Sequence, residues 1–332
     1  MQIAGAQINN FDFPVLIAEI SGNHNGSILK AKRLIREAKK AGADFVKTQC
    51  YDADTLTLDC RKVDFIIQSG LWRGQTLHEL YTKACTPPEW HKELYEVAQG
   101  EGIAIFSSVF DRRGLDLLES LGCPAYKIAS FEVGDTPLIR QVAATGKPLI
   151  ISTGLATDEE IKAAKDAAGP KGKVAFLHCT SEYPGNIENS SLNRIAELQL
   201  QLDGYCIGIS DHTPGHLVPI AATVLGVAII EKHLKLENSP SEDDSFSLTP
   251  AQFSTMRTAI AQAWEALKPR KVVAGGIQFK RSLYAVADIA EGDNFTHDNI
   301  RSIRPGYGAP PRMLPRLLGT KASKNYRLGD PI

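Results

Sequence analysis

Two histidines stand at the ends of consecutive short apolar runs: His212 follows residues 205–210, and His233 follows residues 228–232. If these runs are neighbouring strands, their backbones lie about 5 Å apart, close enough for both imidazoles to bind one metal ion. The alternative is two histidines that form separate hydrogen bonds. Because no third His or Cys is nearby, water and substrate oxygen would complete the shell. That favours an exchangeable ion of the Mn²⁺ or Mg²⁺ type over a closed zinc site.

Lysines and serines stand at the ends of other apolar runs. Lys47 and Lys127 supply fixed positive charge, and hydroxyl groups accompany them at Ser108, Ser130, Ser152 and Ser210. A small polyanion such as a phosphate ester needs donors of this kind when no glycine-rich loop is present. Each serine taken singly can instead bond to the backbone at a strand end. As a group they predict an anion site.

Glu19 ends the first apolar run of the chain. It can form an ion pair with Lys47 on a neighbouring strand. A carboxylate beside a cation and a metal site is also a candidate general acid or base. Both interpretations stay open at this point.

These residues must be positioned by a repeated strand and helix pattern. Eight β-branched runs alternate with helical segments, which is typical of a parallel sheet covered by crossover helices. The runs are 15–20, 44–49, 103–107, 125–128, 148–152, 174–178, 205–210 and 228–232. Polar groups at their C-terminal ends include Ser107, His178 to Tyr183, Asp211 and Glu231 to His233. Eight βα units predict a TIM (β/α)8 barrel with its site at that face. An open doubly wound sheet is the alternative.

Helix signals and composition divide the chain. Thr86, Thr157 and Thr249 each precede a Glu or Gln by three residues, which predicts three capped helix starts. The last barrel helix is expected at 253–267. We therefore predict a barrel domain over 1–267, a linker rich in charge, Pro and Gly over 268–281, and a small β-rich domain over 282–332. The small domain has few residues for a stable core of its own, so we expect it to dock on something.

Composition excludes several classes of partner. With 37 Lys and Arg against 38 Asp and Glu, the chain has no basic surplus for nucleic acid or anionic lipid. Six scattered cysteines without C-x-x-C spacing indicate reduced thiols. There is no signal-peptide pattern and no apolar run long enough to span a bilayer. We expect a cytoplasmic protein with no membrane association.

Longer motifs contain these residues. They are IAEISGNHNGS, GADFVKTQ, FSSVFD, YKIASFE, PLIISTGLAT, LHCTSEYP, GISDHT, IEKHLKL and SIRPGYGAPP. Together they resemble the sialic-acid (N-acylneuraminate) synthase family, from about residue 17 to the C-terminus. Three stretches, LWRGQTLHELYTKACTPPEWHKEL, SEDDSFSL and SIRPGYG, are most similar to its pseudaminate branch, which uses 2,4-diacetamido-2,4,6-trideoxy-L-altrose. The C-terminal segment resembles the SAF, or antifreeze-like, domain.

The resemblance implies a reaction and a role for each group. Phosphoenolpyruvate would condense with an N-acetylated amino sugar at a divalent metal on His212 and His233, with Mn²⁺ expected and Mg²⁺ or Co²⁺ as alternatives. Glu19 and His212 would be catalytic. Phosphoenolpyruvate would contact Lys47, Ser108, Lys127, Ser130, Ser152, Ser181 and Ser210. The sugar would contact Gln49, Glu132, Tyr183 and Asp243, and Arg304 from the partner subunit of a domain-swapped homodimer.

The sequence departs from the neuraminate pattern at three positions. Val109 replaces a proline, Ser181 stands where an asparagine is usual, and Phe131 replaces a glycine beside Glu132. A phenylalanine there would make the sugar pocket smaller and more apolar, which suits a 6-deoxy sugar. N-acetylneuraminate or legionaminate synthesis is the alternative activity. Three more distant classes stay open: an aldolase that uses a sugar phosphate, a metal-dependent hydrolase, and a carbohydrate- or ice-binding module.

Overall fold

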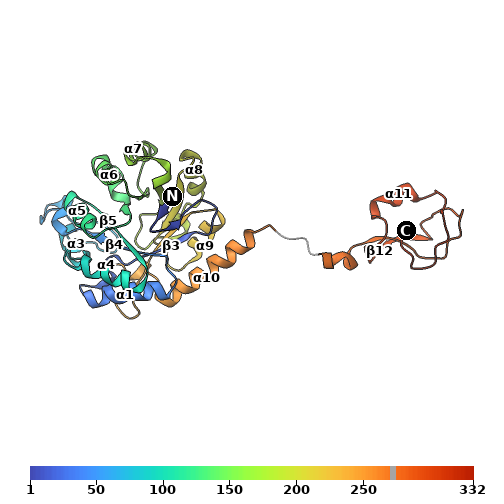
Figure 1. The fold of residues 1–332 in the computed structure, drawn as a ribbon, viewed down its shortest axis with the longest axis horizontal. Helices are drawn as coiled ribbons and strands as arrows, with labels where there is room; N and C mark the ends of the chain where they lie inside the picture. Colours follow the sequence, from blue (N-terminus) through green and yellow to red (C-terminus); the bar gives the residue numbers. More distant parts are fainter. Residues whose placement is uncertain (270–273) are drawn as a thin grey trace. The chain divides into compact units, whose positions relative to one another are not determined.

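The computed structural model describes residues 1–269 and 274–332. The chain divides into two compact units, Met1–Lys268 and Pro269–Ile332, which are coloured blue to orange and orange to red in Figure 1. Part of the predicted linker, residues 270–273, lies outside the described residues. A 3-10 turn, η7 (Ala274–Phe279), occupies much of its second half.

The first unit is a closed barrel of eight parallel strands. They are β3 (Val15–Glu19), β4 (Phe45–Cys50), β5 (Ala104–Val109), β6 (Tyr126–Ile128), β7 (Leu149–Ser152), β8 (Val174–Cys179), β9 (Cys206–Asp211) and β10 (Ile229–His233). Each strand pairs with its neighbour in sequence, and β10 closes the ring on β3. The TIM barrel is therefore confirmed, and the open sheet is wrong. The strands are wholly or almost wholly buried because helices cover the barrel from outside.

Helices follow the strands and form the outer ring (Figure 1). They are α1 (Ile28–Lys40), α4 (Trp90–Glu101), α5 (Arg112–Ser120), α6 (Thr136–Ala143), α7 (Asp158–Ala168), α8 (Asn193–Gln201), α9 (Leu217–Val224) and α10 (Pro250–Leu267). Apolar side chains of α1 such as Leu34 and Ile35 are fully buried against the barrel. None of the described helices is long and apolar enough to cross a lipid bilayer.

Two of the three predicted helix caps are confirmed. Thr157 and Thr249 form reciprocal capping boxes with Glu160 and Gln252. The prediction for Thr86 is wrong, since α4 begins only at Trp90 and has no side-chain cap. The Thr86 hydroxyl instead lies 3.3 Å from Nε2 of His24.

One connection, from Tyr51 to Glu89 between β4 and α4, contains structure of its own. It includes α2 (Ala53–Leu56), η2 (Val63–Phe65) and α3 (Leu77–Ala84). Capping boxes start both α2 and α3. The segment is therefore an ordered addition to the barrel.

The second unit has an antiparallel pair, β11 (Ser282–Ala285) with β12 (Ile300–Ile303), and two short turns, η8 (Pro311–Met313) and α11 (Leu314–Leu317). Its small core consists of Ala285, Ile289, Phe295, Ile300 and Ala322. This agrees with the small β-rich domain expected at the C-terminus.

Candidate active site

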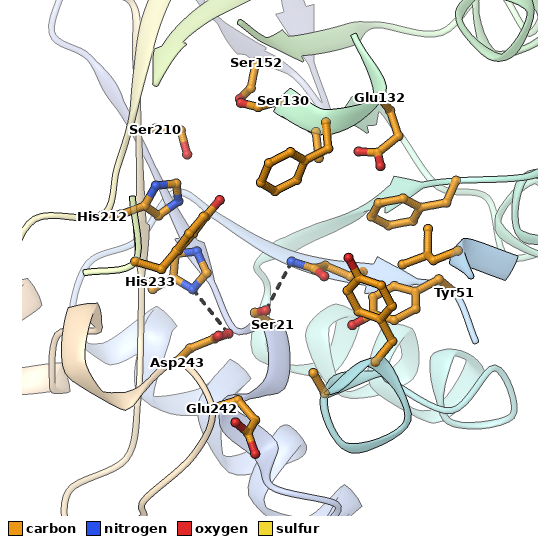
Figure 2. A pocket seen from close by; sticks show the side chains of 18 of the residues that line it. Ser21, Tyr51, Ser130, Glu132, Ser152, Ser210, His212, His233, Glu242 and Asp243 are labelled. Carbon is orange, nitrogen blue, oxygen red and sulfur yellow. Dashed lines mark hydrogen bonds and ion pairs between the residues drawn. The ribbon is translucent and has the colours of Figure 1, made fainter. Parts of the chain in front are cut away.

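A cavity of about 540 Å³ lies at the C-terminal ends of the barrel strands. Figure 2 shows side chains from several strand ends converging on it, with His212 and His233 on one side and Tyr51 on the other. The predicted site residues that line it are Lys47, Gln49, Lys127, Ser130, Glu132, Ser152, Tyr183, Ser210, His212, His233 and Asp243. The convergence expected from the strand ends is thus present in the structure.

Three predicted residues lie behind the lining, and a fourth belongs to the other unit. Glu19 and Ser108 are fully buried and contact Lys47. Ser181 follows β8, and its hydroxyl lies 3.9 Å from the Cys179 sulfur, which lines the cavity. Arg304 follows β12 in the second unit and is exposed.

Lys47 lies between two buried carboxylates. It forms an ion pair with Glu19, its partner on the neighbouring strand, and its Nζ lies 3.5 Å from Oε1 of Glu231. It also donates a hydrogen bond of 3.1 Å to Ser108. Although burial disfavours the charged lysine, the two carboxylates raise its pKa above the ordinary value. Lys47 is therefore a fixed cation at the cavity floor.

The two carboxylates titrate differently. Burial raises the pKa of Glu19, and Lys47 and His233 offset this only in part. Burial acts on Glu231 in the same direction, but Lys47, Lys127 and His233 together hold its pKa at about 2. Ser210 also donates a 3.0 Å hydrogen bond to Glu231. The charges around Glu231 thus favour its ionised form, whereas burial shifts the pKa of Glu19 in the opposite direction.

Lys127 provides the second cation of the cavity. It donates hydrogen bonds to Ser152 at 2.6 Å and to the carbonyl of Ile128 at 2.8 Å. Burial and the nearby Lys47 lower its pKa to about 8, although Glu231 acts in the opposite direction. Ser130 lies on the loop after β6 and accepts a hydrogen bond from the Gly154 amide at 3.2 Å. Two lysines and several hydroxyls, all buried side chains, therefore converge on the cavity.

The histidine pair has the geometry expected from the strand order. The rings of His212 and His233 lie 5.2 Å apart between centroids. Nδ1 of His212 lies 3.0 Å from the Thr180 carbonyl, which fixes the ring and leaves Nε2 available as a ligand. Nδ1 of His233 is buried without a hydrogen bond among the described residues, 3.7 Å from Oδ2 of Asp243.

These residues fit a divalent ion that keeps exchangeable ligands. In the described part of the chain, no three His, Cys, Asp or Glu side chains gather in a way that can hold a metal. A pair of imidazoles leaves most of a coordination shell to water and substrate, unlike a closed structural zinc site. The orphaned nitrogen of His233 is the kind of buried polar atom that a bound ligand satisfies.

Asp243 is held in the site by a loop that Asn23 anchors. The Asn23 amide donates 2.9 Å hydrogen bonds to the Leu234 carbonyl and to Ser247, and its oxygen accepts one from Ser241. Asp243 itself accepts a hydrogen bond from the Gly22 amide at 3.3 Å. The loop after β10 is therefore tied to the loop after β3.

Several residues of the cavity received no role from the sequence. Glu231 lies two positions before His233 on β10, so the period of two along that strand could have found it, whereas Ser21 and Tyr51 lie beyond the ends of β3 and β4. The connection between β4 and α4 adds an apolar surface, which no sequence pattern of this kind could have predicted. It is made of Leu56, Ile67, Trp72, Leu77 and Leu80. The remaining lining residues without a predicted role are Cys179, Tyr81, Ala84, Phe110, Ala129 and Glu242.

Other polar residues at the strand ends do not belong to the cavity. Lys232 is buried and pairs with Asp211 at 2.5 Å. His178 lies 2.7 Å from the Ser190 carbonyl through Nε2. These side chains have the opposite parity to the lining residues and join the strands to the surrounding loops.

A closed (β/α)8 barrel whose C-terminal mouth holds two buried lysines and a histidine pair belongs to the class of TIM-barrel enzymes. Comparison with known proteins narrows this class. The NeuB family model matches residues 34–271, and the SAF domain model matches residues 280–332. The chain belongs to the NeuB family.

Relatives of similar length support this assignment. The chain is 44% identical to a pseudaminic acid synthase from Campylobacter jejuni, over 98% of both chains, and 42% identical to one from Helicobacter pylori, over 96% of both. A Campylobacter jejuni N,N'-diacetyllegionaminic acid synthase is 33% identical, over 96% of this chain and 98% of its own. An N-acetylneuraminic acid synthetase from Leptospira borgpetersenii superposes with a TM-score of 0.73 at 27% identity, covering 83% of this chain and 93% of its own.

Proposed function

We propose that the protein condenses phosphoenolpyruvate with 2,4-diacetamido-2,4,6-trideoxy-L-altrose and water, giving pseudaminate and phosphate. It would be a transferase that forms a carbon–carbon bond. The observation that carries the proposal is that Lys47, Lys127 and the histidine pair face one buried cavity. Identity of 42–44% to pseudaminic acid synthases, against 33% to a legionaminic acid synthase, favours this acceptor.

Phosphoenolpyruvate would bind at the lysines and serines. Its phosphate and carboxylate are both anionic, and charge-assisted hydrogen bonds from buried donors are the strong ones. Lys47 and Lys127 supply the charge, and Ser130, Ser152 and Ser210 supply hydroxyls on the same surface. Ser108 and Ser181 would act from behind by holding Lys47 and the loop after β8.

His212 and His233 would hold a divalent metal, with Mn²⁺ expected and Mg²⁺ or Co²⁺ as alternatives. When bound, such an ion polarises the aldehyde oxygen of the open-chain sugar. The Thr180 carbonyl orients the imidazole of His212, and Asp243 lies 3.7 Å from Nδ1 of His233. Cys179, with its sulfur 3.8 Å from Nδ1 of His212, contributes to the packing of that ring.

Proton transfer would fall to Glu19. Carbon 3 of phosphoenolpyruvate forms a bond to carbon 1 of the aldehyde, and the aldehyde oxygen gains a proton to become a hydroxyl. Water then adds to carbon 2 and loses a proton, and phosphate leaves as the bond between carbon 2 and its oxygen breaks. The pKa of Glu19 is raised by burial while that of Glu231 is about 2, so Glu19 is the carboxylate that would take up and return the water proton, by way of Lys47, which contacts Glu19 and lines the cavity.

The acceptor sugar would lie against Gln49, Glu132, Tyr183 and Asp243. Burial raises the pKa of Glu132 to about 7, despite Lys127. Near neutral pH this side chain can therefore either donate a hydrogen bond to an amide carbonyl or accept one from an amide N–H. One oxygen of Glu132 is buried without a partner among the described residues, which suits a ligand contact.

The test measures phosphate release from phosphoenolpyruvate with purified protein, Mn²⁺ and one acceptor at a time. The panel holds the altrose sugar, N-acetylmannosamine and the diacetamido sugar of the legionaminate route. We expect the largest kcat/KM with the altrose sugar and no release without an acceptor. A larger kcat/KM with another acceptor would assign legionaminate or neuraminate synthesis instead. Phosphate release at the same rate with and without every acceptor would refute the proposal that the protein is a synthase.

Arg304 would complete the site of a partner subunit in a domain-swapped homodimer. Inactive Glu19→Ala and Arg304→Ala chains are mixed and allowed to exchange subunits. Half of the random dimers are mixed, and each has one site with both residues intact, so activity should return to about a quarter of wild type. A mixture that exchanges subunits and stays inactive would refute the swap.

A further inference from the structure

The cavity has two chemically different sides. Lysines, hydroxyls and the histidine pair come from the strand ends, whereas the connection between β4 and α4 contributes the apolar wall, defined as Leu56, Ile67, Trp72, Leu77 and Leu80. Tyr51 and Tyr81, whose rings lie 5.9 Å apart, also line the cavity. In Figure 2 Tyr51 lies across the cavity from His212 and His233. A ligand that spans the cavity therefore meets polar groups at one end and apolar groups at the other.

A short pairing of the chain holds Trp72 in place. Ile66 and Thr76 form an antiparallel bridge. Within it the Ile67 amide donates to the Gln75 carbonyl and the Gly74 amide donates to the Ile67 carbonyl, both at 2.9 Å. Gly74 has a φ of +88°, a conformation that favours glycine. The wall is thus preorganised before a ligand binds.

Aromatic contacts connect this wall to the reaction centre. The Trp72 ring lies 5.8 Å from that of Tyr183, and Tyr183 lies 4.4 Å from His212. Trp72 therefore contacts Tyr183 directly, and that one ring separates it from His212, the proposed metal ligand. An acceptor whose aldehyde carbon faces His212 and His233 reaches the wall with the carbons farthest from the aldehyde.

We infer that the apolar wall selects the acceptor by the group on its carbon 4 and by its carbon 6, an inference that rests on the proposed function. The 4-acetamido methyl and the 6-methyl are the apolar groups at that end of the sugar. Burying them against Trp72 and Leu77 is favourable, whereas a hydroxyl placed against the aliphatic side chains of the wall, Leu56, Ile67, Leu77 and Leu80, loses its water without gaining a partner from them. The wall also limits how long the acyl group on nitrogen 4 can be.

The test replaces Trp72 and compares two acceptors, the 4-acetamido sugar and its analogue with a 4-butanamido group. Trp72→Ala should shift the ratio of kcat/KM toward the butanamido analogue by about tenfold to 200-fold, the range for one apolar pocket contact. The KM for phosphoenolpyruvate should stay within about threefold of wild type, because the lysines are untouched. Leu71→Ala is the matched control, since Leu71 is adjacent and exposed and does not line the cavity.

An unchanged acceptor ratio in Trp72→Ala, or an equal shift in Leu71→Ala, would overturn the inference. If Trp72→Ala does not fold, Leu77→Ala on the same wall gives the same comparison. If the apolar wall does not select the acceptor, the wild-type protein still condenses the 4-acetamido sugar. Failure of the wild type to condense that sugar would refute the proposed function instead, so the two failures are distinguishable.

Discussion

Replacing Lys47 by Met should destabilise the barrel strongly at neutral pH. The substitution removes the cation between Glu19 and Glu231 and leaves two carboxylates in a site that excludes water. Removing one partner of a buried ion pair typically costs about 3–5 kcal/mol. The pKa of Glu231 lies at about 2 against an ordinary 4.5, a separation of about 3 kcal/mol that Lys47 shares with Lys127 and His233, so Lys47 supplies only part of it through Glu231.

The pH dependence has a definite sign. A carboxylate whose pKa is lowered on folding stabilises the protein above its unfolded pKa, and that contribution is lost as pH falls toward its folded pKa. For Glu231 the window runs from about pH 4.5 down to about pH 2. The stability difference between wild type and Lys47→Met should therefore be full at pH 7 and should shrink below about pH 4.5.

Urea unfolding of both proteins between pH 7 and about pH 3, which enters the window below pH 4.5, measures this difference. The matched control is Lys32→Met, which breaks the surface ion pair of Lys32 with Glu93, where the Glu93 side chain is 52% exposed. That change should cost less than about 1 kcal/mol. A loss below about 1 kcal/mol for Lys47→Met at pH 7, or a loss that does not vary with pH, would refute the assignment of Lys47 as the counter-charge.

Three further predictions concern the reaction. Glu19→Gln should leave phosphoenolpyruvate binding largely intact and reduce turnover by about 10²–10⁴-fold, as measured by steady-state kinetics; near-normal turnover would leave Glu19 a structural role only. Alanine at His212 or His233 should abolish Mn²⁺ binding in calorimetry together with activity, because a site with two protein ligands cannot lose one, and unchanged affinity would contradict the metal site. Phe131→Gly should improve 6-hydroxy acceptors relative to the altrose sugar by about 1–3 kcal/mol in kcat/KM, since Phe131 lines the cavity; an unchanged ratio would remove it from the sugar site.

The sequence was sufficient to predict the barrel and most of the cavity for one physical reason. Parallel strands present their C-terminal ends on one face, so polar residues at those ends must meet once the sheet closes. Lys47, Lys127 and His233 were found in this way. Glu231 was at a predicted strand end but received no role, although it shares the inward parity of His233.

Other features depend on packing that no local pattern specifies. The apolar wall comes from a long connection, and Trp72 reaches the cavity only because that connection lies over the barrel mouth. Thr86 matches a capping pattern, yet two prolines follow it and His24 offers its hydroxyl another partner. Thr76 matches the same pattern and does cap α3. The pattern alone cannot separate these cases, because the surrounding contacts determine which hydrogen bond forms.

The layering of the barrel interior explains why the pKa values of its charged side chains are shifted. Side chains two positions apart on a strand share a face, so Ile17 lies below Glu19 and Phe45 lies below Lys47. Ile17 and Phe45 are buried, and the Phe45 ring packs 6.1 Å from that of Phe106. The charged layer therefore rests on an apolar layer, where water cannot screen it and electrostatic effects are strong. In this setting Lys47, Lys127 and His233 together hold the pKa of Glu231 at about 2, whereas burial raises the pKa of Glu19, and this asymmetry is what the proposed proton transfer at Glu19 requires.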